Sequence, residues 1–171
     1  MRLLLAIWAT KFAAAMLRAL GRAGTHVPGR IARRIHPGVI GAIAHPARVI
    51  AITGTNGKTT ASNVLTEALL VQGLRVVSNR LGSNLAAGIA ASLISAVDWR
   101  GRSRAEVAVL EVDERSARLI LPELAPELLV CLNLTRDSIK RNAHPAYIAF
   151  DPPDGDRAHW RSHARRWLNH T

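Results

Sequence analysis

The second part of the chain, from residue 48 onward, alternates between short apolar runs and stretches with helical spacing. Four apolar runs predict strands, at Arg48–Gly54, Leu74–Asn79, Ala105–Val112 and Leu128–Leu134. The stretches between them predict helices, at Lys58–Gln72, at residues 84–97 and at Glu114–Leu121. Strands that alternate with helices predict an α/β fold with a parallel sheet and right-handed crossovers.

Two details of this pattern predict parts of the core. The spacing within the first of these helices predicts one side that packs on the sheet, formed by Val64, Leu65, Ala68 and Leu69. Cys131 lies in the middle of the fourth apolar run. A cysteine in such surroundings is expected to be an inert part of the core.

Residues 1–47 predict a basic helical segment that precedes the sheet. Residues 1–22 are apolar with spaced cations, and the longest uninterrupted apolar run, Leu3–Ala9, is much shorter than the ~20 residues of a membrane span. We expect an amphipathic helix that packs on the rest of the protein; a helix on an anionic membrane surface and a targeting segment are the alternatives. Glycines and prolines in residues 23–48 predict short helices and turns, with Arg30, Arg33 and Arg34 on a solvated face.

The basic charge is concentrated in the same segment. The chain has 171 residues and a net charge of +11, and residues 1–50 hold eight Lys or Arg and no acidic residue. Residues 51–150 hold eleven basic and nine acidic residues, so the charge gives no reason to expect a nucleic-acid partner for the central part. The single cysteine excludes an internal disulfide. Residues 150–171 form an atypical tail, which could form a helix with Trp160, Ala164 and Trp167 on one side.

The strongest candidate for chemistry is the sequence TGTNGKTT at residues 53–60, between the first predicted strand and its helix. Its two glycines let successive amides point at phosphate oxygens, at the positive end of a helix. A lysine there can reach the β- and γ-phosphates of ATP, and the next hydroxyl can bind Mg²⁺. The first glycine of the ordinary P-loop pattern is replaced by Ile52. The predicted nucleotide-binding residues are Gly54, Thr55, Asn56, Gly57, Lys58, Thr59 and Thr60.

Polar residues also follow the other predicted strands. Because ligands of open parallel sheets bind at the carboxyl ends of the strands, these residues are candidates for the same site. Glu111, at the end of the third strand, is predicted to be a second Mg²⁺ ligand, and Asp113 falls on the same side. For both acids, a cap of the following helix is the alternative. The predicted substrate contacts are Asn79, Arg80, Asn84, Asn133 and Asp137.

The loop TGTNGKTT after a β-branched strand resembles that of the Mur ligase family and its folylpolyglutamate synthase relatives. One branch, the Mur-ligase-like subunits of lipid II isoglutaminyl synthases, is similar over three further stretches: NRLGSNLAAGIA (Asn79–Ala90), VAVLEVDE (Val107–Glu114) and NLTRDSIKRNAH (Asn133–His144). The resemblance covers residues 1–149 and implies that residues 48–149 are part of a Mur ligase central, ATP-binding domain. Lys140 departs from the acidic residue common at its position.

By this resemblance, the protein is a cytoplasmic ligase of peptidoglycan synthesis that uses ATP and Mg²⁺. In this branch ATP phosphorylates the stem-peptide glutamate of lipid II, and ammonia from a glutamine amidotransferase-like partner subunit attacks the acyl phosphate. The resemblance implies catalytic roles for Lys58 and Glu111 and Mg²⁺ binding by Thr59 and Glu111. If residues 1–22 contact lipid, the protein would lie at the inner face of the membrane.

Later parts of the family's pattern do not appear in the chain. The rest of the central domain and the C-terminal domain that closes over the nucleotide have no counterpart, which suggests a truncated or frameshifted ligase subunit with little ligation activity of its own. Three alternatives remain at this point: a folylpolyglutamate synthase-like ligase, a non-catalytic nucleotide-binding module, and a nucleic-acid or membrane binder that acts through residues 1–50.

Overall fold

The computed structural model of the protein describes residues 1–21, 26–80 and 83–133. The predicted helix with Trp160 and the candidate residue Asp137 lie outside these ranges. The described helices are α1 (Arg2–Ala19), α2 (His26–Ile35), α3 (Val39–Ala42), α4 (Lys58–Val71), α5 (Ala86–Ser95) and α6 (Glu114–Leu124). The described strands are β1 (Arg48–Thr53), β2 (Val76–Ser78), β3 (Val107–Glu111) and β4 (Leu128–Cys131).

The four strands form one parallel sheet in the order β2-β3-β1-β4. The predicted α/β fold with a parallel sheet is therefore confirmed. In the central pair, Ile50 of β1 lies opposite Val109 of β3, and on the other side Thr53 lies opposite Cys131 of β4. β1, the strand that leads into the glycine loop, therefore lies between β3 and β4. This arrangement brings Glu111, at the end of β3, and the residues after Cys131 of β4 close to the loop.

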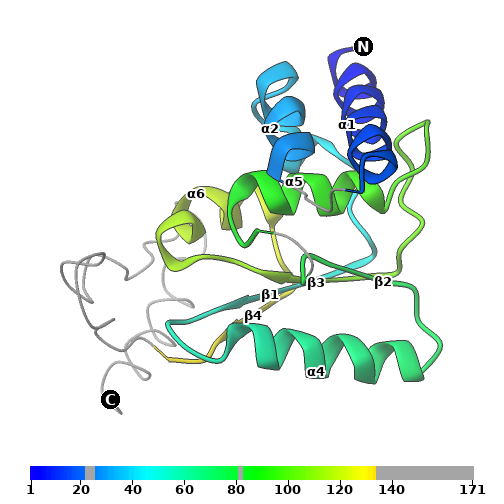
Figure 1. The fold of residues 1–171 in the computed structure, drawn as a ribbon. Coiled ribbons are helices and arrows are strands. Elements are labelled where there is room, and N and C mark those ends of the chain that lie inside the picture. The colour runs from blue at the N-terminus through cyan, green and yellow to red at the C-terminus, as the bar shows by residue number, and fades with distance from the viewer. Residues whose placement is uncertain (22–25, 81–82, 134–171) are drawn as a thin grey trace.

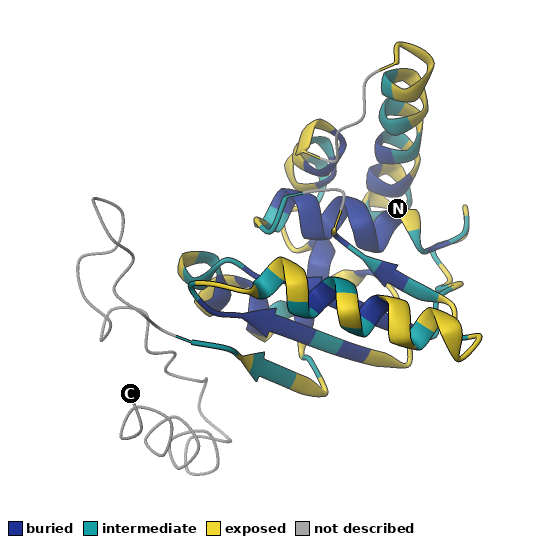
Figure 2. Ribbon diagram, turned by 60° about the horizontal axis from the view of Figure 1, so that its bottom comes forward, coloured by how far each residue is buried: buried dark blue, intermediate teal, exposed yellow. Residues whose placement is uncertain are grey.

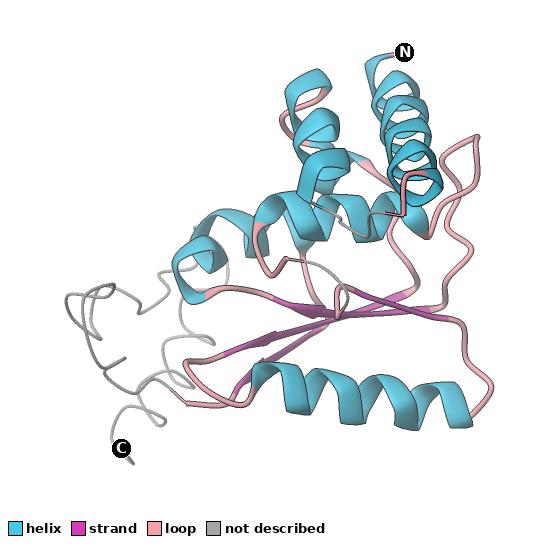
Figure 3. Ribbon diagram, viewed as in Figure 1, coloured by secondary structure: helices cyan, strands magenta, loops and turns pink. Residues whose placement is uncertain are grey.

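Helices cover both faces of the sheet (Figures 1 and 3). α4 packs on one face, where Leu65 and Leu69 contact a buried cluster that contains Ile52 and Val109. The predicted inward side of this helix was only half right. Val64 and Ala68 are exposed, because the inward stripe at i, i+4 spacing runs through Ala61, Leu65 and Leu69 and leaves Val64 on the other side.

α5 and α6 cover the opposite face, and α1 and α2 form a further layer over α5 (Figure 1). One hydrophobic cluster joins these layers, with Ile7 of α1, Ala32 of α2 and Ile40 of α3 packed together with Ile89 and Leu93 of α5. Figure 2 shows the buried residues of this cluster between the helices and the sheet. The prediction that the first helix packs on the rest of the protein is confirmed for one face of α1.

α2 lies unusually close to α5. A Cβ atom placed on Gly29 would lie 1.7 Å from the main-chain oxygen of Ala87, so only glycine allows this approach. Pro28 lies in the first turn of α2, where a proline is tolerated because its missing amide has no acceptor within the helix. The three arginines of α2 are exposed, as the sequence predicts.

Cys131 contradicts its predicted place in the core, because its side chain is exposed. Both end residues of β4 are exposed and its two middle residues are only partly buried, whereas the last three residues of β1 are buried. The reason is position: in the described sheet β1 lies between two strands, and β4 lies at the edge.

Candidate functional site

The glycine loop connects the carboxyl end of β1 to the first turn of α4. Gly57 is the residue that precedes the helix, and its φ of 83° lies in the left-handed region that favours glycine. Gly54 has a φ of 139°, and a Cβ atom there would lie 3.0 Å from the main-chain nitrogen of Asn133. Both glycines are therefore required by the path of the loop, and the loop delivers its last residues to the positive end of α4.

Asn133, two residues after the end of β4, is hydrogen-bonded to the glycine loop. Its side-chain Oδ1 accepts a hydrogen bond from the amide of Asn56 at 2.9 Å, and its Nδ2 donates to the carbonyl of Asn56 at 2.9 Å. The Asn133 carbonyl also accepts from the amide of Thr55 at 2.8 Å. The structure therefore places this predicted substrate contact on the main chain of the loop, in a role that sequence reasoning missed.

Thr59 and Glu111, the two predicted Mg²⁺ ligands, lie together. The Thr59 hydroxyl donates to Oε2 of Glu111 at 3.1 Å, and Glu111 is only 7% exposed. A hydroxyl and a carboxylate beside a phosphate-binding loop are a donor set that suits Mg²⁺, which takes few protein ligands and completes its shell with water and phosphate oxygens. No group of three or more His, Cys, Asp or Glu that could hold a metal occurs within the described ranges, so a metal here would need such outside ligands.

The ammonium group of Lys58 is held inside the site. It donates to the carbonyls of Gly54 and Thr55, and it lies 3.3 Å from Oε1 of Glu114. The side chains of this ion pair are only 13% and 8% exposed. Sequence reasoning did not single out Glu114, although it follows Glu111 by three residues at the same end of β3.

Asn79 is buried under the site. Its Nδ2 donates to the carbonyl of Glu111 at 2.9 Å and its Oδ1 accepts from the amide of Glu111 at 2.8 Å. The Nδ2 also donates to Ser83 at 3.3 Å, and the residue is 2% exposed. In this structure Asn79, a predicted substrate contact, fixes the main chain at Glu111.

The remaining candidates lie around this edge of the sheet. Arg80 forms an ion pair with Glu67 of α4. The main-chain carbonyl of Asn84 accepts from the amide of Asp113 at 3.0 Å. Asp113 is the N-cap of α6, where its side chain accepts from the amide of Arg115, so the capping alternative is confirmed for this residue.

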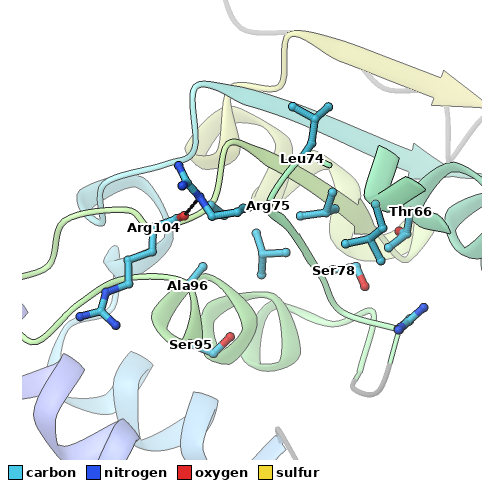
Figure 4. A pocket seen from close by; sticks show the side chains of 12 residues that line it. Thr66, Leu74, Arg75, Ser78, Ser95, Ala96 and Arg104 are labelled. Atoms are coloured by element: carbon cyan, nitrogen blue, oxygen red, sulfur yellow. Dashed lines mark hydrogen bonds between the residues drawn. The ribbon is translucent and has the colours of Figure 1, made fainter. Parts of the chain in front are cut away.

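A separate cavity of about 550 Å³ follows β2 between α4 and α5. Figure 4 shows three of its lining residues, Thr66, Arg75 and Arg104, with the hydrogen bond of 2.8 Å from Arg75 Nε to the Arg104 carbonyl. No residue of the glycine loop lines it. Arg80 does, which places this candidate between the cavity and the loop's edge of the sheet.

No protein-family model matches the chain. Among individual proteins, the lipid II isoglutaminyl synthase (glutamine-hydrolyzing) subunit MurT of Staphylococcus aureus strain N315 is 36% identical over 142 residues, which are 82% of this chain and 32% of that protein. The subunit of the same name from Streptococcus pneumoniae strain ATCC BAA-255 / R6 is 34% identical over 131 residues, 74% of this chain and 28% of the relative.

Other ligases match shorter stretches. The UDP-N-acetylmuramoylalanine–D-glutamate ligase of Prochlorococcus marinus strain MIT 9313 is 38% identical over 95 residues, 54% of this chain and 19% of that enzyme. A solved structure of a UDP-N-acetylmuramoyl-L-alanyl-D-glutamate–2,6-diaminopimelate ligase aligns with a TM-score of 0.46 and 24% identity, over 72% of this chain and 26% of that one. The chain spans 32% of the length of its relative from S. aureus. By its sequence relatives, this chain belongs to the Mur ligase family.

Proposed function

We propose that this chain forms the nucleotide-binding part of an ATP-dependent ligase that joins a carboxylate to an amine in peptidoglycan synthesis. The observation that carries the proposal is the contact of 3.1 Å between the Thr59 hydroxyl and the buried Glu111 carboxylate, next to the glycine loop. Such a pair beside a phosphate-binding loop is what a Mg²⁺–nucleotide complex needs.

The described residues would have different roles in nucleotide binding. The amides of the glycine loop and the N-terminus of α4 would hold the phosphates, and Asn133 keeps the loop in its shape. Lys58 would leave Glu114 to contact the β- and γ-phosphates. Thr59 and Glu111 would hold Mg²⁺, which neutralises charge on the phosphates and so favours transfer of the γ-phosphoryl group.

The similarity to subunits of lipid II isoglutaminyl synthases supports finer assignments. The proposed acceptor is the stem-peptide glutamate of lipid II, and the proposed amine is ammonia supplied by a glutamine amidotransferase-like partner subunit. Residues 48–149 would belong to the central, ATP-binding domain, with residues 1–47 as a segment before it. A lipid-linked substrate would bring the protein to the inner face of the membrane.

The decisive experiment measures nucleotide binding, since the chain spans only 32% of its relative's length. A fluorescent ATP analogue is titrated into the protein with Mg²⁺ and with EDTA. The unmodified chain is expected to bind more tightly with Mg²⁺, and Thr59→Val and Glu111→Gln are expected to remove that difference. Glu67→Gln, in an exposed ion pair with Arg80, is the control that should keep it. Binding that does not respond to Mg²⁺ would contradict the proposal.

A further inference from the structure

One face of α1 carries large apolar side chains that nothing in the described structure covers. Leu5, Trp8, Phe12 and Met16 are 52%, 47%, 68% and 52% exposed. They are spaced by three or four residues, which places them in one stripe along the helix. We call these four residues the α1 stripe.

The stripe lies on the side of α1 that faces away from the core. Ala6, Ile7 and Thr10 are the buried residues of this helix, and they pack towards α2 and α5. α1 is thus apolar on two faces, of which the fold uses one, and a row of exposed apolar side chains of this size marks an interaction surface.

A loop extends this surface. The turn at residues 98–103 lies beside α1 (Figure 1), and the indole Nε1 of Trp8 donates to the carbonyl of Trp99 at 2.8 Å. A Cβ atom on Gly101 would lie 3.2 Å from Cδ1 of Ile7, so the loop packs tightly on the helix. Lys11 lies 5.6 Å from the centre of the Trp99 ring, which is itself exposed. The two tryptophans and the stripe form one continuous surface.

The charge around this surface is positive. Residues 1–47 contain seven Lys or Arg and no Asp or Glu. Arg2 of α1 and Arg100 and Arg102 of the loop are exposed. The acidic residue of the loop is Asp98, whose carboxylate accepts from the amides of Arg100 and Arg102. Cations thus border an apolar surface that carries two tryptophans.

We propose that the α1 stripe and Trp99 dock on an anionic lipid surface. Apolar side chains would enter the boundary between headgroups and acyl chains, tryptophans would sit at that boundary, and the arginines would contact lipid phosphates. No described helix is long and apolar enough to span a bilayer, so the contact would be peripheral. A second copy of the chain is a poor occupant, because pairing two such surfaces would bring cations of like sign together.

The inference rests on the proposed function for its lipid-linked substrate, but its test needs no nucleotide. The full chain is mixed with vesicles of phosphatidylcholine alone or with phosphatidylglycerol, and bound protein is measured by flotation. The test variant replaces Leu5, Phe12 and Met16 by serine. The matched control replaces Val64, Val71 and Leu119 by serine, since these apolar residues on α4 and α6 are about as exposed as the stripe residues or more so. Circular dichroism checks that both variants fold.

Binding to the anionic vesicles is expected, with the stripe variant at least about tenfold weaker and the control variant unchanged. Arg2→Gln combined with Arg100→Gln should weaken binding to anionic vesicles and leave the weak binding to phosphatidylcholine as it is. The proposal is overturned if the chain does not bind the anionic vesicles, or if the stripe variant binds them as well as the control variant does. It is equally overturned if the stripe variant abolishes self-association instead, which would identify a second copy as the occupant.

Discussion

Lys58 and Glu114 form an ion pair of 3.3 Å that is almost closed to solvent and joins the glycine loop to the helix after β3. The same ammonium group also donates to the carbonyls of Gly54 and Thr55 in the glycine loop. A nucleotide must therefore compete with Glu114 for the same ammonium group. Loss of the contact with Glu114 would therefore reduce the free energy that Lys58 contributes to nucleotide binding.

Glu114→Gln should show separately what the ion pair contributes to stability and what it does to nucleotide binding. Loss of the carboxylate weakens the contact with Lys58 and is expected to lower the free energy of unfolding by about 1–3 kcal/mol. The same change frees Lys58 and removes a negative charge beside the phosphates, so the variant should bind ATP several-fold more tightly. Thermal melts and titration with a fluorescent ATP analogue measure the two effects. Weaker ATP binding by the variant would show that Glu114 instead positions Lys58 for the phosphates.

Asn79→Ala tests whether the Asn79 side chain holds the main chain of Glu111 in place. The change leaves the buried amide and carbonyl of Glu111 without their side-chain partner and should cost about 1–3 kcal/mol of stability. It should also reduce the Mg²⁺ dependence of ATP binding, because Glu111 is no longer held in place. Asn84→Ala is the comparison, since it keeps the main-chain carbonyl that Asp113 uses. Equal stability of the two variants would argue against this role.

Gly29→Ala tests the contact between α2 and α5. The added methyl group would overlap the carbonyl of Ala87, so the helices must separate, at a cost of about 1–3 kcal/mol or more. Gly38→Ala is the matched control in the same segment, where a Cβ atom meets nothing within 4 Å. Denaturant unfolding measures both. If the first variant is as stable as the second, α2 does not pack on α5 as described.

Asp98 should make the loop beside α1 sensitive to acid. Its hydrogen bonds from the amides of Arg102 and Arg100 hold the pKa of this carboxyl below its ordinary value of 3.8. Because the folded-state pKa is the lower one, the stabilisation is complete above the unfolded pKa and is lost as the pH falls through the folded pKa. Asp98→Asn should therefore melt earlier than the unmodified chain at neutral pH, and the gap should close in acid. A gap that is constant down to low pH would contradict this.

The sequence pattern predicts most of the fold, because β1 and β3 are apolar apart from one terminal charged residue each, and apolar runs rich in β-branched residues are typical of strands in a covered parallel sheet. It also predicts that Thr59 and Glu111 lie close together, since Thr59 follows β1, Glu111 ends β3, and the carboxyl ends of parallel strands share one edge of the sheet. The partners of Lys58, Asn79 and Asn133 could not be read in the same way. Lys58 reaches Glu114, Asn79 reaches the main chain of Glu111, and Asn133 reaches the main chain of Asn56. These partners lie far apart in the sequence, and no local pattern encodes such contacts.

The prediction for Cys131 failed for a related reason. An apolar run indicates a strand but not its place in the sheet, and β4 lies at the edge of the described strands. The close contact at Gly29 was equally hidden, because a glycine within a breaker-rich stretch reads as a turn rather than as a helix crossing.

The exposed position of Cys131 has a practical consequence. It is the only cysteine of the sequence, and it pairs in register with Thr53, the residue just before the glycine loop. A fluorophore or spin label attached to this thiol would lie a short distance from the glycine loop, and no other cysteine would have to be removed first. Movements of the loop on nucleotide binding could thus be followed spectroscopically in the natural sequence.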